Sequence, residues 1–192
     1  MQTLESAQPL ILGVGNVLFG DEGLGVHLAS LLKSNYHLIA AEPGAGLPPA
    51  IVDGGTLGPH LIPLLTNHRQ VLLLDSITAD NAAPGEVFCF DYQQLPAPLK
   101  GRGSAHEVEM QQTLAMMRLA GDLPHITVLA AVPKIISKTT FELSPEAQQA
   151  AVTMEQKALE IVDRWGFTAT RRAHASIAEI ARHCCRGVAC GS

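Results

Sequence analysis

Aromatic and charged residues are both scarce in this chain of 192 residues. Phe, Tyr and Trp together make up 4% of it and Asp, Glu, Lys and Arg 16%, whereas hydrophobic residues reach 47%. So few charges among so many hydrophobic residues argue against a disordered polypeptide. A chain of this length can bury its own core, and we expect one packed domain whose interior is built from Leu, Ile, Val and Ala.

Basic clusters and long hydrophobic runs are missing as well. The formal net charge is -5 and no basic run precedes the C-terminal tail, which argues against a nucleic-acid partner. The N-terminus lacks the positively charged start of a signal peptide. The first apolar run is too short, and too interrupted by Gly, to cross a membrane. We therefore expect a cytoplasmic protein without membrane insertion.

Cysteine is rare and gathered at one end. Of the four cysteines, Cys184, Cys185 and Cys190 lie within the last nine residues, close to His183. A structural zinc site needs two spaced pairs of ligands, and this spacing does not supply them. In a reducing compartment the pattern favours free thiols on a tail, with metal binding as the alternative.

Apolar runs alternate with amphipathic segments along the chain. We predict strands at residues 9–14, 50–53, 70–75, 86–91 and 125–132, and helices at 23–33, 57–67, 105–120 and 145–165. The run at 70–75 is apolar almost throughout, as in a parallel strand buried on both faces. The pattern predicts a single-domain α/β fold, a three-layer αβα sandwich with a mostly parallel, doubly wound sheet. This domain covers residues 1–166, and 167–192 form a tail that is partly helical or disordered.

Local signals set the helix boundaries. Thr56 is expected to cap the second helix, and Ser144 to cap the fourth, which Gly166 ends. In the third helix the spacing of Met110, Leu114 and Met117 places all three side chains in the core.

The first predicted strand runs into a glycine turn that carries two adjacent carboxylates, Asp21 and Glu22. The turn imitates a dinucleotide fingerprint, but Leu18 stands where its third glycine belongs, and the acidic pair would repel a pyrophosphate. A helix N-terminus favours ionised carboxylates. We therefore expect a functional site without a nucleotide, and keep a nucleotide-binding α/β enzyme as a rival interpretation.

Further polar residues follow two more strands, at Asp53 and Asp75. Ligands of doubly wound sheets bind outside the carboxyl ends of the strands, so these carboxylates are candidates to join Glu22 in one site. His106, at the start of the third helix, could complete a mixed nitrogen and oxygen ligand set that suits Zn, Ni, Co or Fe. The alternative is structural: a lone Asp after a strand often caps a helix, and Asp53 can simply hold the turn that follows it.

The acidic turn resembles a motif of the nickel-iron hydrogenase maturation endopeptidases. The similarity covers the chain from about residue 10 to 166 and is carried by Gly13-x-Gly15-Asn16-x-Leu18-x-x-Asp21-Glu22-Gly23-x-Gly25-Val26, Asp53-Gly54-Gly55-Thr56, Leu74-Asp75-Ser76-Ile77, Pro84-Gly85, His106 and Leu143-Ser144-Pro145. Two regions depart from the family pattern: a longer segment before Asp53, and residues 132–138, which lack the acidic or glycine residues often found there.

The resemblance implies an endopeptidase of the aspartic type. Such an enzyme removes the C-terminal extension of a hydrogenase large-subunit precursor after nickel insertion. Glu22, Asp75 and His106 match the family's metal ligands, and the nickel they contact belongs to the precursor. Asp53, Glu22 and Asp75 are the expected catalytic residues, and either a carboxylate activates the water or the metal polarises the carbonyl. A non-catalytic nickel-binding assembly factor or metallochaperone is the alternative.

Overall fold

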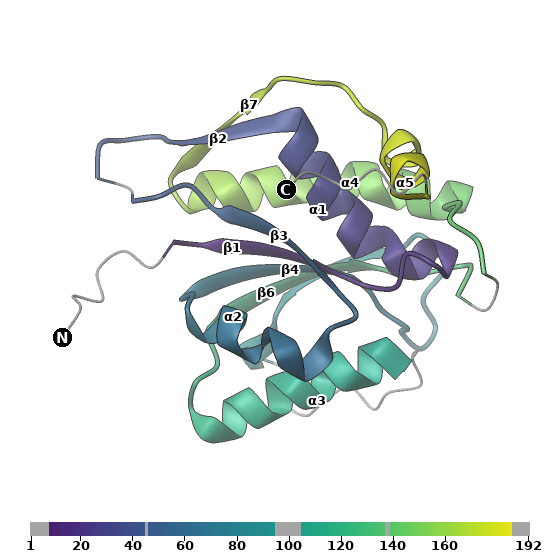
Figure 1. The fold of residues 1–192 in the computed structure, drawn as a ribbon, viewed down its shortest axis with the longest axis horizontal. Helices are drawn as coiled ribbons and strands as arrows, with labels where there is room; N and C mark the ends of the chain where they lie inside the picture. The colour runs from purple at the N-terminus through teal and green to yellow at the C-terminus, as the bar shows by residue number, and fades with distance from the viewer. Residues whose placement is uncertain (1–7, 45, 95–104, 137–138, 186–192) are drawn as a thin grey trace.

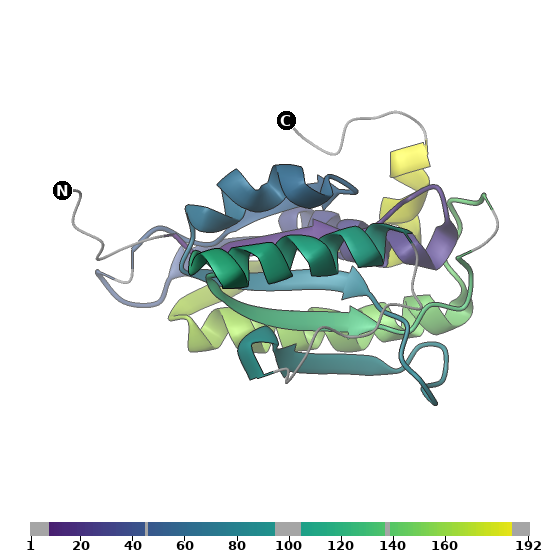
Figure 2. The ribbon, with the colours of Figure 1, turned by 90° about the horizontal axis from the view of Figure 1, so that it is seen from below.

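The computed structural model describes residues 8–44, 46–94, 105–136 and 139–185, without the side chains of 105–107 and 185. Its centre is a five-stranded sheet of order β3-β1-β4-β6-β5. The strands are β1 (Leu10–Val14), β3 (Ala50–Gly55), β4 (Gln70–Ser76), β5 (Val87–Asp91) and β6 (His125–Ala131). All pair in parallel except β5, which runs antiparallel to β6 (Figure 2).

Helices cover both faces of this sheet (Figure 1). One face carries α1 (Leu24–Asn35), α4 (Pro145–Arg164) and α5 (Ile177–Cys185), and the other α2 (Ile62–Thr66) and α3 (Ala105–Ala120). Short 3-10 turns form at η1 (Gly20–Gly23), η2 (Gly58–Leu61) and η3 (Tyr92–Gln94). The arrangement confirms the predicted three-layer α/β fold with a mostly parallel sheet.

Side chains of β4 alternate between two hydrophobic cores. Leu72 and Leu74 pack with α1 and α4, whereas Val71 and Leu73 pack with α2 and α3. A strand covered on both faces has no solvent-facing positions, which explains its continuous apolar sequence. No helix in the described part of the chain combines the length and the apolar character needed to cross a bilayer.

Most of the helix signals are confirmed. Met110, Leu114 and Met117 are each 2% exposed, and Ser144 Oγ caps α4 by accepting a hydrogen bond from the Ala147 amide at 3.1 Å. The prediction for Thr56 is wrong. η2 and α2 replace one continuous helix, and no side chain caps η2. The reason is Gly58, whose φ of +44° is incompatible with a regular first helical turn.

Two strands that the sequence analysis did not predict form a second sheet. β2 (Tyr36–Ala40) pairs antiparallel with β7 (Phe167–Arg171), immediately after the end of α4. The Tyr36 hydroxyl and the Arg171 guanidinium both donate to Glu155 Oε1 of α4, at 2.7 and 2.8 Å. Residues directly after Gly166, where the sequence suggested a tail, are thus paired and packed.

α5 is fastened to α1 by one buried side chain. Asn35, at the end of α1, donates from Nδ2 to the Ala175 carbonyl at 2.8 Å and accepts the Ala175 amide at 2.9 Å. Ile177, Ile180 and Ala181 then bury the inner face of α5 in the core. Among the tail cysteines Cys184 is half-buried, whereas the Cys185 side chain and Cys190 lie outside the described part of the chain.

His27 is a fully buried histidine in α1. It is 0% exposed, and neither ring nitrogen has a hydrogen-bond partner among the described residues. Burial lowers its pKa from 6.5 to about 4 because a charged imidazolium is poorly solvated there. The unfolded chain therefore binds more protons than the folded one between these pH values, so the stability contributed by neutral His27 is complete above pH 6.5 and is lost as the pH falls.

We expect His27→Leu to remove this pH dependence. In the native chain His27 alone lowers the free energy of unfolding by about 2 kcal/mol between roughly pH 7.5 and pH 5. Urea denaturation at both pH values, for the native chain and the variant, measures the difference. His37→Gln, on the exposed side of β2, is the control. An unchanged pH dependence in His27→Leu would show that another group causes it.

Candidate functional site

Two glycines bring the start of α1 against the sheet. A Cβ at Gly25 would lie 2.2 Å from the Leu74 carbonyl oxygen and 2.5 Å from that of Val14, and a Cβ at Gly13 would lie 2.4 Å from the Gly25 carbonyl oxygen. Any side chain at either position would therefore push the helix off the strands. Because the contact is so close, η1, which precedes α1 and carries Asp21 and Glu22, lies at the carboxyl ends of β1 and β4.

Asp21 is a buried acceptor that joins three segments. Its carboxylate is 0% exposed and accepts the amides of Lys134 and Ile135 at 2.9 and 3.0 Å. It also accepts the Ser144 amide at 2.7 Å and the Ser144 hydroxyl at 2.8 Å. Charge-assisted hydrogen bonds of this kind are the strong ones. Asp21 thus holds η1, the segment after β6 and the cap of α4 in fixed positions.

Glu22 is also buried, but it lacks the hydrogen bonds that Asp21 makes. It is 5% exposed, and its carboxylate has no hydrogen-bond partner among the described residues. Its oxygens are not among the fully enclosed polar atoms that lack a partner in the described chain, so they remain within reach of water. Such a group is typical of a site that a substrate or ion completes. The sequence presents Asp21 and Glu22 as an equivalent pair, and only long-range hydrogen bonds separate their roles.

Asp75 lies near the end of β4, beside η1. It is 5% exposed, and its Oδ1 accepts the Ser76 amide at 2.7 Å. Asp75 pairs in register with Ala130, which packs in the core under α3, so its side chain shares the face of the sheet that α3 covers. η1 contacts β4, so Glu22 and Asp75 belong to the same part of the edge.

His106 is in the first turn of α3, but its side chain lies outside the described part of the structure. The N-terminal part of α3 packs against η2, where a Cβ at Gly58 would come within 3.0 Å of Glu109 Oε2. The helix therefore begins at the carboxyl edge of the sheet, the edge that also carries Asp75. The backbone places this predicted ligand on the face to which Asp75 belongs.

Asp53 occupies a different place from Glu22 and Asp75. It is exposed on β3 and pairs in register with Gly13, which faces α1, so its side chain belongs to the opposite face from Asp75. Its Oδ1 accepts the Gly55 amide at 2.9 Å, and Gly55 has a φ of +50°. Asp53 thus holds the turn at the end of β3, as the structural alternative expected, and its second carboxylate oxygen has no hydrogen-bond partner among the described residues.

The described side chains contain no group of three or more His, Cys, Asp or Glu that could hold a metal ion. His106 is not among them. The ligand set of Glu22, Asp75 and His106 therefore stays a prediction, and the structure shows only that η1, which carries Glu22, contacts β4, which carries Asp75.

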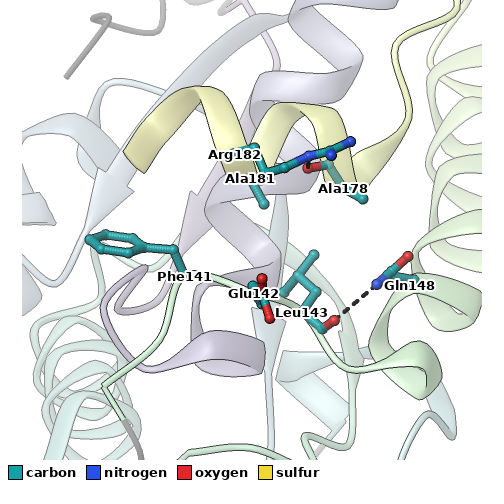
Figure 3. A pocket seen from close by; sticks show the side chains of 7 residues that line it. All are labelled: Phe141, Glu142, Leu143, Gln148, Ala178, Ala181 and Arg182. Carbon is teal, nitrogen blue, oxygen red and sulfur yellow. Dashed lines mark hydrogen bonds between the residues drawn. The ribbon is translucent and has the colours of Figure 1, made fainter. Parts of the chain in front are cut away.

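A cavity of about 240 Å³ opens beside the segment that Asp21 holds (Figure 3). It lies between α5 and the residues that lead into α4, with Phe141, Glu142 and Leu143 on one side and Ala178, Ala181 and Arg182 on the other. Gln148 Nε2 closes one end by donating to the Leu143 carbonyl at 2.9 Å. None of the predicted site residues lines this cavity.

Lys134 also anchors the segment after β6 to α4. Its Nζ donates to Glu146 Oε1 in the first turn of α4 at 2.5 Å, which holds the pKa of the Glu146 carboxyl below its usual range. The segment after β6 is therefore anchored at both Asp21 and Glu146.

Comparisons with known proteins agree on one family. The family described as hydrogenase maturation protease matches residues 26–161, which include Asp53, Asp75 and His106 but not Glu22. Protein HydD of Wolinella succinogenes is 41% identical over 157 residues, covering 81% of this chain and 96% of that protein. Hydrogenase 2 maturation protease of Escherichia coli K12 is 26% identical over 163 residues, covering 81% of this chain and 95% of that protein.

The fold agrees with a solved structure as well. The hydrogenase maturating endopeptidase HybD from Escherichia coli superimposes with a TM-score of 0.74 at 26% identity, covering 86% of this chain and 98% of that one.

The different environments of Asp21 and Glu22 predict that substitution lowers stability far more at Asp21 than at Glu22. Asp21→Ala leaves the amides of three residues without an acceptor, that of Ser144 in a buried position, and we expect it to lower the free energy of unfolding by roughly 3–5 kcal/mol. Glu22→Gln, the matched change in the same turn, should alter it by less than about 1 kcal/mol. Urea denaturation of both variants measures the difference. Equal destabilisation would contradict the assignment of Asp21 as the structural member of the pair.

Proposed function

We propose a specific reaction for this chain, which belongs to the hydrogenase maturation protease family and is therefore a peptidase with a role in hydrogenase maturation. It removes the C-terminal extension of a nickel-iron hydrogenase large-subunit precursor once nickel has been inserted. The observation that supports this best is the buried carboxylate of Glu22, which has no hydrogen-bond partner in the described chain and lies at the edge of the sheet that also carries Asp75.

Nickel enters this proposal as part of the substrate. Two carboxylates and one imidazole, from Glu22, Asp75 and His106, suit a divalent nickel ion and leave coordination positions for ligands from the precursor. The metal, already fixed in the precursor, gains its remaining ligands from the protease. The free energy of this metal binding then stabilises the C-terminal extension in the position for cleavage, so that cleavage occurs only after nickel has been inserted.

Hydrolysis requires a water to be activated at the scissile carbonyl. The water adds to the carbonyl carbon, the C–N bond breaks, and the departing amine takes up a proton. Asp53, Glu22 and Asp75 are the carboxylates proposed to take part, in keeping with an aspartic type of peptidase. Asp53 is exposed and so is accessible to a water, whereas Glu22 and Asp75 are the buried pair assigned to the metal, which can also polarise the carbonyl.

Cleavage of a nickel-loaded precursor tests the proposal. The native chain should release one defined C-terminal peptide, whereas Glu22→Gln, Asp75→Asn and His106→Ala should slow release by about 100-fold or more. Mass spectrometry of the precursor measures it. Nickel-free precursor, as the control, should stay intact even at high enzyme concentration. An intact precursor with verified nickel would favour the non-catalytic assembly factor, which should bind nickel tightly on its own.

Two variants of Asp53 separate the effect of its charge on catalysis from its effect on the turn at the end of β3. Asp53→Asn keeps an oxygen for the Gly55 amide but removes the charge, whereas Asp53→Ala removes both. If the carboxylate works as a base, Asp53→Asn should fold like the native chain and lose about 100-fold or more in kcat. Single-turnover cleavage and thermal unfolding of both variants check this. Native activity in Asp53→Asn with loss in Asp53→Ala would assign Asp53 to the turn alone.

A further inference from the structure

Three large apolar side chains stand exposed at the edge of the sheet that carries the acidic residues. Leu18 follows β1, Leu57 follows β3 and Ile136 follows β6, with exposures of 46%, 53% and 39%. β1, β3 and β6 are parallel and end at the same edge, the one toward which the arrows of β4 and β6 point in Figure 2. We call Leu18, Leu57 and Ile136 the apolar rim.

Hydrogen bonds of the backbone hold Leu18 and Leu57 in place. The Leu18 amide donates to Asn16 Oδ1 and its carbonyl accepts the Thr140 amide, both at 3.0 Å. The Leu57 amide donates to the Gly54 carbonyl at 3.3 Å and its carbonyl accepts the His60 amide at 3.0 Å. These bonds fix the main chain of Leu18 and Leu57, and their exposed side chains would lose contact with water only when a partner covers them.

Ile136 is fixed through its neighbour. The Ile135 amide donates to Asp21 Oδ2, and the Ile135 carbonyl accepts the Asp21 amide, both at 3.0 Å. The same segment returns to η1 at Thr140, whose carbonyl accepts the Gly20 amide at 2.7 Å. Leu18 and Ile136 thus belong to one hydrogen-bonded unit, of which η1 is a part.

The rim lies on both sides of the acidic part of the edge. In the order β3-β1-β4-β6, the ends of β1 and β4, where Glu22 and Asp75 lie, fall between the strands that precede Leu57 and Ile136. Three strand spacings separate β3 from β6, or about 14 Å. An extended polypeptide of about four or five residues spans that distance.

We propose that the apolar rim selects the substrate by binding apolar side chains of the precursor segment that flanks the cleaved bond. This rests on the proposed function. An extended polypeptide fits because it presents apolar side chains at separated points, which the rim can bury. The polar backbone between those side chains can lie next to the carboxylates. Acidic lipid headgroups do not fit, because Glu22, Asp53 and Asp75 lie along the same edge.

The test separates recognition from chemistry. Leu18→Ser, Leu57→Ser and Ile136→Ser should each raise KM for the nickel-loaded precursor by about tenfold, with kcat changed much less, because each loses the burial of one apolar side chain on binding. Leu119→Ser, 90% exposed in the last turn of α3, is the matched control and should cleave like the native chain. Leu18→Met, which keeps an apolar side chain at this position, should have the KM of the native chain.

Each result decides between the two proposals. If the native chain cleaves the precursor and the rim variants match its kcat/KM, the rim is not a recognition surface and the peptidase proposal stands. If the native chain does not cleave, the Kd for the same precursor, measured by calorimetry for native chain and variants, still reports on the rim: equal Kd values overturn it and a tenfold loss supports it. A native dimer that the rim variants convert to monomers would instead assign the rim to self-association.

Discussion

The position of the candidate site depends on the carboxylate of Asp21. Its oxygens accept hydrogen bonds from Lys134, Ile135 and Ser144, residues more than a hundred positions away along the chain. Through Ser144, which also caps α4, the same carboxylate is connected to the longest helix of the structure. A turn held this firmly keeps its next residue, Glu22, beside the end of β4. The hydrogen bonds of Asp21 therefore fix the position of the unpartnered carboxylate beside it.

Close backbone contact provides the second constraint. Gly13 and Gly25 let α1 lie directly on β1 and β4, so that the distance between η1 and the end of β4 is set by backbone atoms and not by flexible side chains. Glu22 and Asp75, which come from a 3-10 turn and a central strand, are consequently held in position before any substrate arrives. Preorganisation of this kind spares the binding free energy that ordering a loop would otherwise consume.

The sequence predicted the elements that have strong local signals and missed those that depend on distant partners. The apolar run of β4, the spacing of Met110, Leu114 and Met117 and the Ser144 cap each carry their own signal, and all are confirmed. β2 and β7 are short strands whose pairing joins segments far apart in the chain, so no local pattern predicts them. The same holds for Asp21 and Glu22, which look alike until the residues bonded to Asp21 are known.

Chemistry and substrate choice are separable in this architecture. Glu22 and Asp75 come from η1 and β4, whose relative position is fixed by the glycine contacts, whereas the side chains exposed around them come from the loops after β1, β3 and β6. Loop side chains can change without moving the carboxylates, because the loop backbones are held by hydrogen bonds that do not involve those side chains. The segment after β6 is one of the two regions where this sequence departs from the family pattern, and it is anchored by main-chain amides to Asp21. If the rim binds the precursor as proposed, substitution of Leu57 or Ile136 would change which precursor is bound while Glu22 and Asp75 stay in place.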